Sequence, residues 1–413
     1  MNFKKTTLPN GLRIITVPTK GNPSVTVMVL VETGSNYEKK SENGLSHFLE
    51  HMMFKGTPKR PSSKIIHREL DNMGAQANAF TDDELTGYYA KVEKRQWKKA
   101  LDVISDMYLR PLIPEKDLEN ERGVIIQEID MNEDHPQRKV WDVLGRILYG
   151  DTPAGWTTLG SKENINSFSR KDFLEYHKKH YTAKKTIVVI VGDLNEKEVK
   201  KEVQKILKNI SLDKKLDKLP VKEYQKTPTM LLEKKKTEQT HIVIAFRGFN
   251  AGNKRSSALS LLATILGKGF SSRLFEKLRD EMGACYYVRA SHDGYTDHGF
   301  FTVSAGIEAK RSEEVVRAIL DECRLLTKKL VSQDELNKAK DYLVGNLYLN
   351  LETSDALAEF YAFKEIVKSK LETPKEKEKK IRAVTAQAIQ KVAREIFQNK
   401  NLNLAVVGDI KNP

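Results

Sequence analysis

The sequence predicts an α+β protein made of two copies of one unit, and its length and an internal repeat carry this prediction. Its 413 residues exceed one typical core and suffice for two or three domains. Residues 184–195 and 401–412 both read as a buried strand followed by Gly-Asp, which places Gly192 and Gly408 at equivalent positions. These glycines lie 216 residues apart, a little over half of the chain. We therefore expect two related domains that each end on the same strand.

The first expected element is a strand near the N-terminus. Apolar residues follow an Asn-Gly pair of the kind that forms hairpin turns: Leu12, Ile14, Ile15 and Val17. The two N-terminal lysines precede no apolar signal core, and no run of about eighteen apolar residues occurs, so we expect neither a signal peptide nor a membrane span. The chain has two cysteines, Cys285 and Cys323, which are too few for a disulfide framework. These features predict a cytoplasmic protein.

The segment GLSHFLEHMMFKGT, residues 44–57, predicts a helix that binds a metal. Asn43 is the expected N-cap, and apolar residues recur at helical spacing: Leu45, Phe48, Leu49 and Met52. His47 and His51 are four residues apart and share one face, with Glu50 beside them. An isolated histidine is usually an ordinary core or surface residue, whereas this five-residue pattern is rare by chance. Two imidazoles form half of a zinc site, and Glu50 is the expected base.

A third ligand is expected on another helix, because a catalytic zinc usually has three protein ligands. Residues 118–134, LENERGVIIQEIDMNED, contain several acidic residues among apolar ones. Glu121 and Glu128 are seven residues apart and therefore share a helix face. This spacing suits one of them as a ligand and the other as its supporting partner. Spacing alone does not decide which is which.

Residues 44–57, together with Asn78-Ala79-Phe80-Thr81 and Thr86-Gly87-Tyr88-Tyr89, resemble the zinc peptidases with an inverted HxxEH motif. This is the family of pitrilysin, insulin-degrading enzyme and mitochondrial processing peptidase, and the chain is similar to its small bacterial branch. The resemblance implies that His47 and His51 bind zinc and that Glu50 activates water. It also implies a third ligand 77 positions after the second histidine, which is Glu128, and a supporting glutamate at Glu121.

The resemblance also implies the domain organisation. Each of two homologous domains is expected to be a mainly antiparallel sheet covered by helices. Residues 1–212 form the expected zinc-binding catalytic domain, residues 213–228 a lysine-rich linker, and residues 229–413 a homologous domain without metal. The second domain has no ligand spacing among its histidines: His241, His292 and His298.

Two further segments resemble substrate-binding parts of the family. In SSRLFEKLRDEMGACYYV, residues 271–288, an arginine and a tyrosine seven positions later are expected to hold the substrate backbone, and these are Arg279 and Tyr286. The adjacent Tyr287 leaves the register open by one residue. Asn78 and Ala79 resemble the family's edge strand, onto which an extended peptide adds by main-chain hydrogen bonds.

The expected function is that of a zinc endopeptidase with one zinc per chain, acting on unfolded peptides in an enclosed chamber. Four such domains enclose the chamber in this family, so one chain with two domains implies a homodimer, or a heterodimer with a related subunit. One alternative is a non-catalytic or co-catalytic subunit of a heteromeric processing peptidase. The net charge of +14 raises nucleic-acid binding as another, but the lysines are interspersed with glutamates and form no aromatic-basic ladder.

Overall fold

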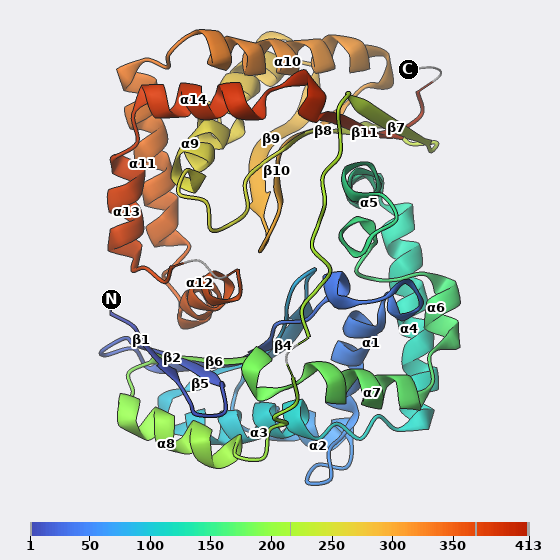
Figure 1. Ribbon diagram of the computed structural model, residues 1–413, viewed down its shortest axis with the longest axis vertical. Helices are drawn as coiled ribbons and strands as arrows, with labels where there is room; N and C mark the ends of the chain where they lie inside the picture. The colour runs from blue at the N-terminus through green and yellow to red at the C-terminus, as the bar shows by residue number, and fades with distance from the viewer. Residues whose placement is uncertain (1, 215, 368–369, 411–413) are drawn as a thin grey trace. The chain divides into compact units, whose positions relative to one another are not determined.

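The computed structural model describes residues 2–214, 216–367 and 370–410 and divides into two compact units. The first unit comprises the described parts of Met1–Ile129, Thr157–Leu219 and Asn350–Ile366. The second unit comprises the described parts of Asp130–Trp156, Pro220–Leu349 and Val367–Pro413. Each unit contains one β-sheet with helices against both faces (Figure 1).

The sheet of the first unit has six strands in the order β1-β2-β6-β3-β5-β4. All neighbours are antiparallel except β2 and β6, which are parallel. The strands are β1 (Lys4–Thr7), β2 (Arg13–Pro18), β3 (Ser24–Val31), β4 (Gln76–Thr81), β5 (Thr86–Glu93) and β6 (Thr186–Gly192). Its helices are α1 (Leu45–Met52), α2 (Ser63–Asp71), α3 (Trp97–Leu109), α4 (Glu115–Asp134), α6 (Lys162–Ser167), α7 (Arg170–His180), α8 (Glu196–Ile206) and α12 (Ser354–Ile366). Helix α4 belongs to this unit as far as Ile129, and its last residues belong to the second unit.

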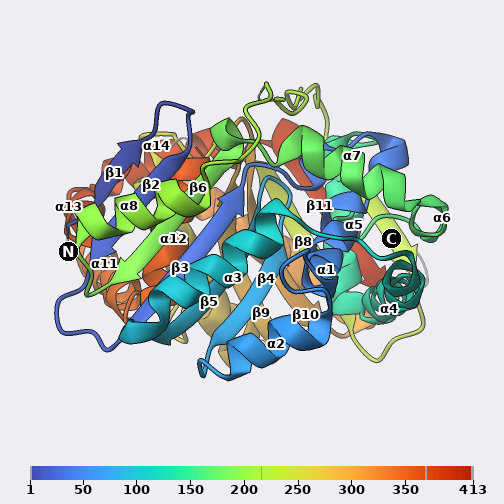
Figure 2. The same ribbon diagram turned by 90° about the horizontal axis from the view of Figure 1, so that it is seen from below.

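The central strand β3 explains how this sheet is covered. It is apolar at nearly every position because both of its faces are buried. Val25, Val27 and Val29 face the core that α3 and α8 complete, and these two helices cross the same side of the sheet (Figure 2). The opposite side is covered by α12, which contacts β2, β3 and β6. Lys5 pairs with Glu365 at 2.6 Å and helps to hold α12 there.

The sheet of the second unit has five strands in the order β7-β11-β8-β10-β9. The strands are β7 (Thr229–Lys234), β8 (Thr240–Arg247), β9 (Cys285–Gly294), β10 (Gly299–Ile307) and β11 (Leu402–Gly408). One face of the sheet forms a core with five helices: α9 (Ser256–Gly267), α10 (Ser312–Lys328), α11 (Gln333–Leu349), α13 (Pro374–Arg382) and α14 (Ala386–Ile396). The other face packs against α5 (Pro136–Tyr149), whose Val140, Val143 and Leu144 are buried there.

The two sheets repeat one topology. β6 lies between β2 and β3, parallel to the first and antiparallel to the second, and β11 has the same relation to β7 and β8. Gly192 and Gly408 each end the repeated strand. The predicted α+β class, with two related and mainly antiparallel sheets, is confirmed.

The two compact units differ from the expected domains 1–212 and 229–413 by one segment each. Helix α5 precedes residue 212 but lies on the second sheet, and α12 follows residue 229 but lies on the first. The domain limits themselves remain a prediction. Within 213–228, the described residues form no helix or strand. None of the described helices combines the length and apolar character that a membrane crossing requires.

Candidate metal and catalytic site

Helix α1 carries the two histidines, and a buried carboxylate fixes its start. Its apolar face is buried in the core of the first unit, which orients the other face outward: Leu45, Phe48, Leu49 and Met52. The expected N-cap was wrong. The helix begins after Gly44, at φ 99°, and the side chain of Asn43 instead donates to Glu38 at 3.1 Å. The Glu38 carboxylate accepts from the backbone N–H groups of Gly44 at 2.9 Å and Ser46 at 2.7 Å, and so takes the place of an N-cap.

Gly44 is required by both its backbone and its surroundings. A positive φ of 99° is strained for residues with a Cβ. A Cβ at this position would also lie 2.8 Å from the carbonyl oxygen of Leu159. The backbone conformation at Gly44 is therefore fixed by close packing, and it sets the direction in which α1 begins.

Helix α4 brings the two candidate carboxylates to α1. Ile125 and Ile129 are buried in the first core and hold the helix, whereas the apolar Val124 is 41% exposed. Glu121 and Glu128 project from the same side of α4, as their spacing of seven predicts. Both reach the histidines of α1.

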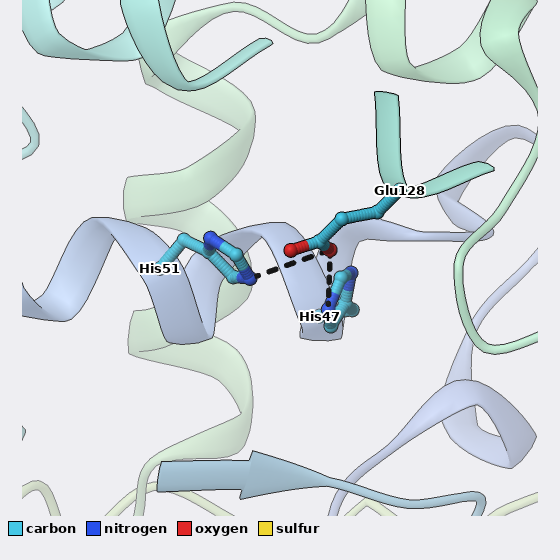
Figure 3. A group of neighbouring side chains, drawn as sticks. All are labelled: His47, His51 and Glu128. Carbon is cyan, nitrogen blue, oxygen red and sulfur yellow. Dashed lines mark ion pairs between the residues drawn. The ribbon is translucent and has the colours of Figure 1, made fainter. Parts of the chain in front are cut away.

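His47, His51 and Glu128 converge on one point (Figure 3). The Oε2 atom of Glu128 lies 3.5 Å from Nε2 of His47 and 3.8 Å from Nε2 of His51. Zinc bonds of about 2.0–2.1 Å in tetrahedral geometry separate ligand atoms by roughly 3.4 Å. Two imidazole nitrogens and one carboxylate oxygen also match the ligand types of catalytic zinc. The ligand types therefore fit zinc, and the two distances from Glu128 lie near this separation.

The ring of His51 is oriented by Glu121. Nδ1 of His51 lies 2.9 Å from Oε1 of Glu121 and donates to it, which leaves Nε2 facing Glu128. The other oxygen of Glu121 meets the ammonium group of Lys55. Burial opposes ionisation of Glu121, yet these contacts from His51 and Lys55 leave its pKa below the usual value. Glu121 is thus an ionised support for the ring.

The two histidines have different proton affinities. Burial, and then the neighbouring His51, lower the pKa of His47 from 6.5 to about 4. Burial alone would also lower the pKa of His51, but the hydrogen bond to Glu121 and the charges of Glu128 and Glu50 raise it above the usual value. Among the described residues, the buried Nδ1 of His47 has no hydrogen-bond partner. His47 is therefore a neutral ring at neutral pH, as a metal ligand must be.

Glu50 lies beside this group and has the properties of a proton acceptor. Burial raises its pKa above the usual value, and the Thr81 hydroxyl, which hydrogen bonds to it, opposes part of this shift. Its Oε2 atom is buried and has no hydrogen-bond partner within the described chain. A carboxylate with a raised pKa and a free oxygen is suited to general acid–base chemistry.

Comparison with known proteins identifies the family of this chain. A family model described as "Insulinase (Peptidase family M16)" matches residues 13–162, and one described as "Peptidase M16 inactive domain" matches residues 167–343. The chain is 33% identical over 395 residues to the "Uncharacterized zinc protease YmxG" of Bacillus subtilis, covering 96% of each chain. The chain belongs to peptidase family M16. The M16 chain is also 31% identical over 415 residues to the "Uncharacterized zinc protease SCO5738" of Streptomyces coelicolor, covering 99% of this chain and 90% of that one.

Solved structures show the same M16 fold. A protease from Helicobacter pylori matches with a TM-score of 0.91 at 24% identity, covering 98% of this chain and 99% of that one. A peptidase M16 inactive domain from Pseudomonas fluorescens matches with a TM-score of 0.92 at 17% identity, covering both chains completely. At such low identity these matches concern the fold. The recognised family and the predicted fold are both confirmed.

In this M16 chain the predicted edge strand is β4, which pairs with β5 on one side. Asn78 is exposed, and its side-chain oxygen accepts from the N–H of Ala79 at 2.9 Å. The strand therefore satisfies one of its own donors with a neighbouring side chain. An added peptide strand would have to displace Asn78 from this bond.

Arg279 and Tyr286 lie together in the second unit of the M16 chain. Nη1 of Arg279 donates to the carbonyl oxygen of Tyr286 at 3.0 Å, and the guanidinium lies 5.8 Å from the centroid of the tyrosine ring. Tyr286 is 71% exposed and sits at a bulge in the pairing of β9 with β10. Tyr287 instead pairs through its hydroxyl with His241 at 3.0 Å. These contacts favour Tyr286 over Tyr287 as the partner of Arg279.

The sequence interpretation missed three residues that support the site: Glu38, Lys55 and Thr81. Lys55 follows His51 by four residues, so helical spacing places it on the same side and gave a usable signal. Glu38 gave none, because an acidic residue ahead of a helix is common. The contact of Thr81 depends on how β4 approaches α1, which no local pattern describes.

Proposed function

We propose that this M16 chain is a zinc-dependent endopeptidase that hydrolyses unfolded peptides. The observation that carries the proposal is the convergence of two imidazole nitrogens and one carboxylate oxygen beside Glu50. The names of its relatives, which are called zinc proteases, support the same activity. The retained Glu50 weighs against a purely non-catalytic subunit, because such a subunit has no use for a buried base.

His47, His51 and Glu128 would hold the zinc ion. When bound, zinc in such a site lowers the pKa of its water to about 7 and polarises the carbonyl group under attack. Glu121 keeps Nδ1 of His51 protonated, so that Nε2 is available as a ligand. The role of each side chain thus follows from the atom that it presents.

Glu50 moves the proton in this proposal. Its carboxylate takes a proton from the attacking water and then donates it to the leaving amine. The raised pKa brings the carboxyl group closer to neutral pH, which favours transfer in both directions. The Thr81 hydroxyl lies close enough to offset part of this shift.

Substrate binding is proposed to use backbone rather than side-chain recognition. The open edge of β4, at Asn78 and Ala79, is suited to pairing with an extended peptide. Arg279 and Tyr286 are the proposed second contact, since a guanidinium and a phenol can both donate to peptide carbonyl groups. Such recognition requires an unfolded segment and tolerates many sequences.

The test compares two glutamine variants of the full-length chain. We expect Glu50→Gln to keep one zinc per chain and to lose about 10²–10⁴-fold in turnover of a quenched fluorescent peptide. We expect Glu128→Gln to weaken zinc binding as well, because it removes a ligand. Zinc content is measured by elemental analysis after gel filtration.

The matched control is Glu175→Gln, an exposed carboxylate on α7. It should change neither zinc content nor turnover. Full activity of Glu50→Gln, or a wild-type chain that binds no zinc, would show the proposal to be wrong.

A further inference from the structure

Lys55 contacts Glu121, the carboxylate that supports the ring of His51, although the proposed mechanism gives this lysine no role. It ends the short turn Met53–Lys55 that follows α1, four residues after His51. Its ammonium group meets Oε2 of Glu121, and Oε1 of the same carboxylate accepts from His51 at 2.9 Å. The side chains of Lys55, Glu121 and His51 are 22%, 13% and 19% exposed, so water reaches these contacts poorly. One carboxylate therefore bridges two residues that are one helical turn apart.

This bridge distinguishes two carboxylates that are otherwise alike. Glu121 and Glu128 lie on the same side of α4, and both approach His51. Both oxygens of Glu121 are occupied, one by Lys55 and one by His51. Within the described part of the chain, Glu128 has no lysine or arginine partner and faces the two imidazoles alone. A cation therefore meets an available carboxylate at Glu128 and a neutralised one at Glu121.

We infer that Lys55 is a positioning residue for metal binding and that it acts through Glu121. It holds the carboxylate so that Nδ1 of His51 stays protonated and Nε2 stays free for the ion. It also prevents Glu121 from turning toward the ion and competing with Glu128. Without Lys55, the half-buried carboxylate keeps one contact and can rotate about its terminal bond. The inference rests on the proposed zinc site and adds a residue that selects which glutamate is the ligand.

The first test measures the zinc dissociation constant by competition with a chromophoric chelator, using the full-length chain. We expect Lys55→Met, which keeps most of the length of the side chain and removes its charge, to weaken zinc binding about 10–100-fold. Lys55→Arg keeps the charge and should restore most of the affinity. The matched control is Lys59→Met. Lys59 lies in the same segment but pairs with Asp102, outside the metal-binding group, and its loss should leave the affinity unchanged.

A double-mutant cycle tests whether Lys55 acts through Glu121. In a Glu121→Gln background, Lys55→Met should cause no further loss of affinity. A purely structural role would give the same loss in both backgrounds. A wild-type affinity for Lys55→Met, or equal losses in the two backgrounds, would overturn the inference.

The second test needs no metal. Nitrogen-15 NMR of the metal-free chain, at a pH above the pKa of His51 so that its ring is neutral, reports which ring nitrogen carries the proton. We expect Nδ1–H in the wild type and a mixture of tautomers in Lys55→Met, and an unchanged Nδ1–H signal would count against the inference. If the wild type bound no zinc, the proposed function would fail, while this measurement would still decide whether Lys55, through Glu121, sets the tautomer of His51.

Discussion

His47 and His51 lie one helical turn apart and yet differ in how they hold protons. His47 is shielded by burial and has a pKa of about 4, whereas His51 is tied to Glu121 and has a raised pKa. A metal ion requires both rings to be neutral. Protons should therefore compete with zinc for the two rings at different pH values, although the sequence presents the two histidines as equivalent.

This difference predicts the pH dependence of zinc affinity. The pKa of His51 is raised above 6.5, so its ring gains a proton as the pH falls through this raised pKa, and below it the zinc affinity should fall about tenfold per pH unit. The second proton, on His47, should matter only near pH 4. Chelator competition between pH 5 and 8 measures the slope. If two protons competed with zinc at pH 6, the different pKa values assigned to His47 and His51 would be wrong.

At this scale, spacing predicted much of the site. Residues four and seven apart on helices share a face by geometry, so His47 with His51, and Glu121 with Glu128, could be paired from the sequence. Spacing could not rank the two glutamates, because their difference arises from Lys55, a contact between separate helices. The assignment of Glu128 came from family resemblance.

At the scale of elements, the position of α1 depends on a carboxylate outside it. Glu38 is 3% exposed and accepts from Gly44, Ser46 and the side chain of Asn43. Burial raises the pKa of Glu38 in spite of these bonds. Because α1 carries His47, Glu50 and His51, any shift of its first turn moves the whole site.

We expect Glu38→Gln to destabilise the first unit by about 2–3 kcal/mol, because the amide group presents a donor where backbone donors need acceptors. Denaturant unfolding with zinc chelated measures the loss. The control is Glu42→Gln in the same segment, whose exposed contact to the backbone N–H of Lys39 should cost less than about 1 kcal/mol. Equal stability of Glu38→Gln and wild type would contradict this role.

Sequence patterns predicted where helices and strands lie in the chain better than they predicted which elements pack together. The repeated strands β6 and β11 were predictable because mostly apolar runs mark strands that are largely buried on both faces. The positions of α5 and α12 were not, because an apolar helix face shows that the helix is covered without showing which sheet covers it. Capping at Gly44 was missed for a related reason, since Glu38 acts from outside the local cap pattern.

At the scale of the whole molecule, the chain carries both the metal motif and the Arg279–Tyr286 pair. This combination favours a homodimer over a heterodimer with a related subunit. We expect light scattering of the active protein to give a native mass twice that of the chain. A monomer with full peptidase activity would contradict the dimer.

The exchange of α5 and α12 has a consequence for biosynthesis. Translation completes the strands of the first sheet at residue 192, but the helix that covers one of its faces ends at residue 366. On the ribosome, the apolar surface of β2, β3 and β6 is therefore not covered by α12 during nearly half of the synthesis. Such transient apolar surface is what chaperones bind and what drives misassembly. A nascent chain that stalls before α12 is released should be the form most prone to aggregate.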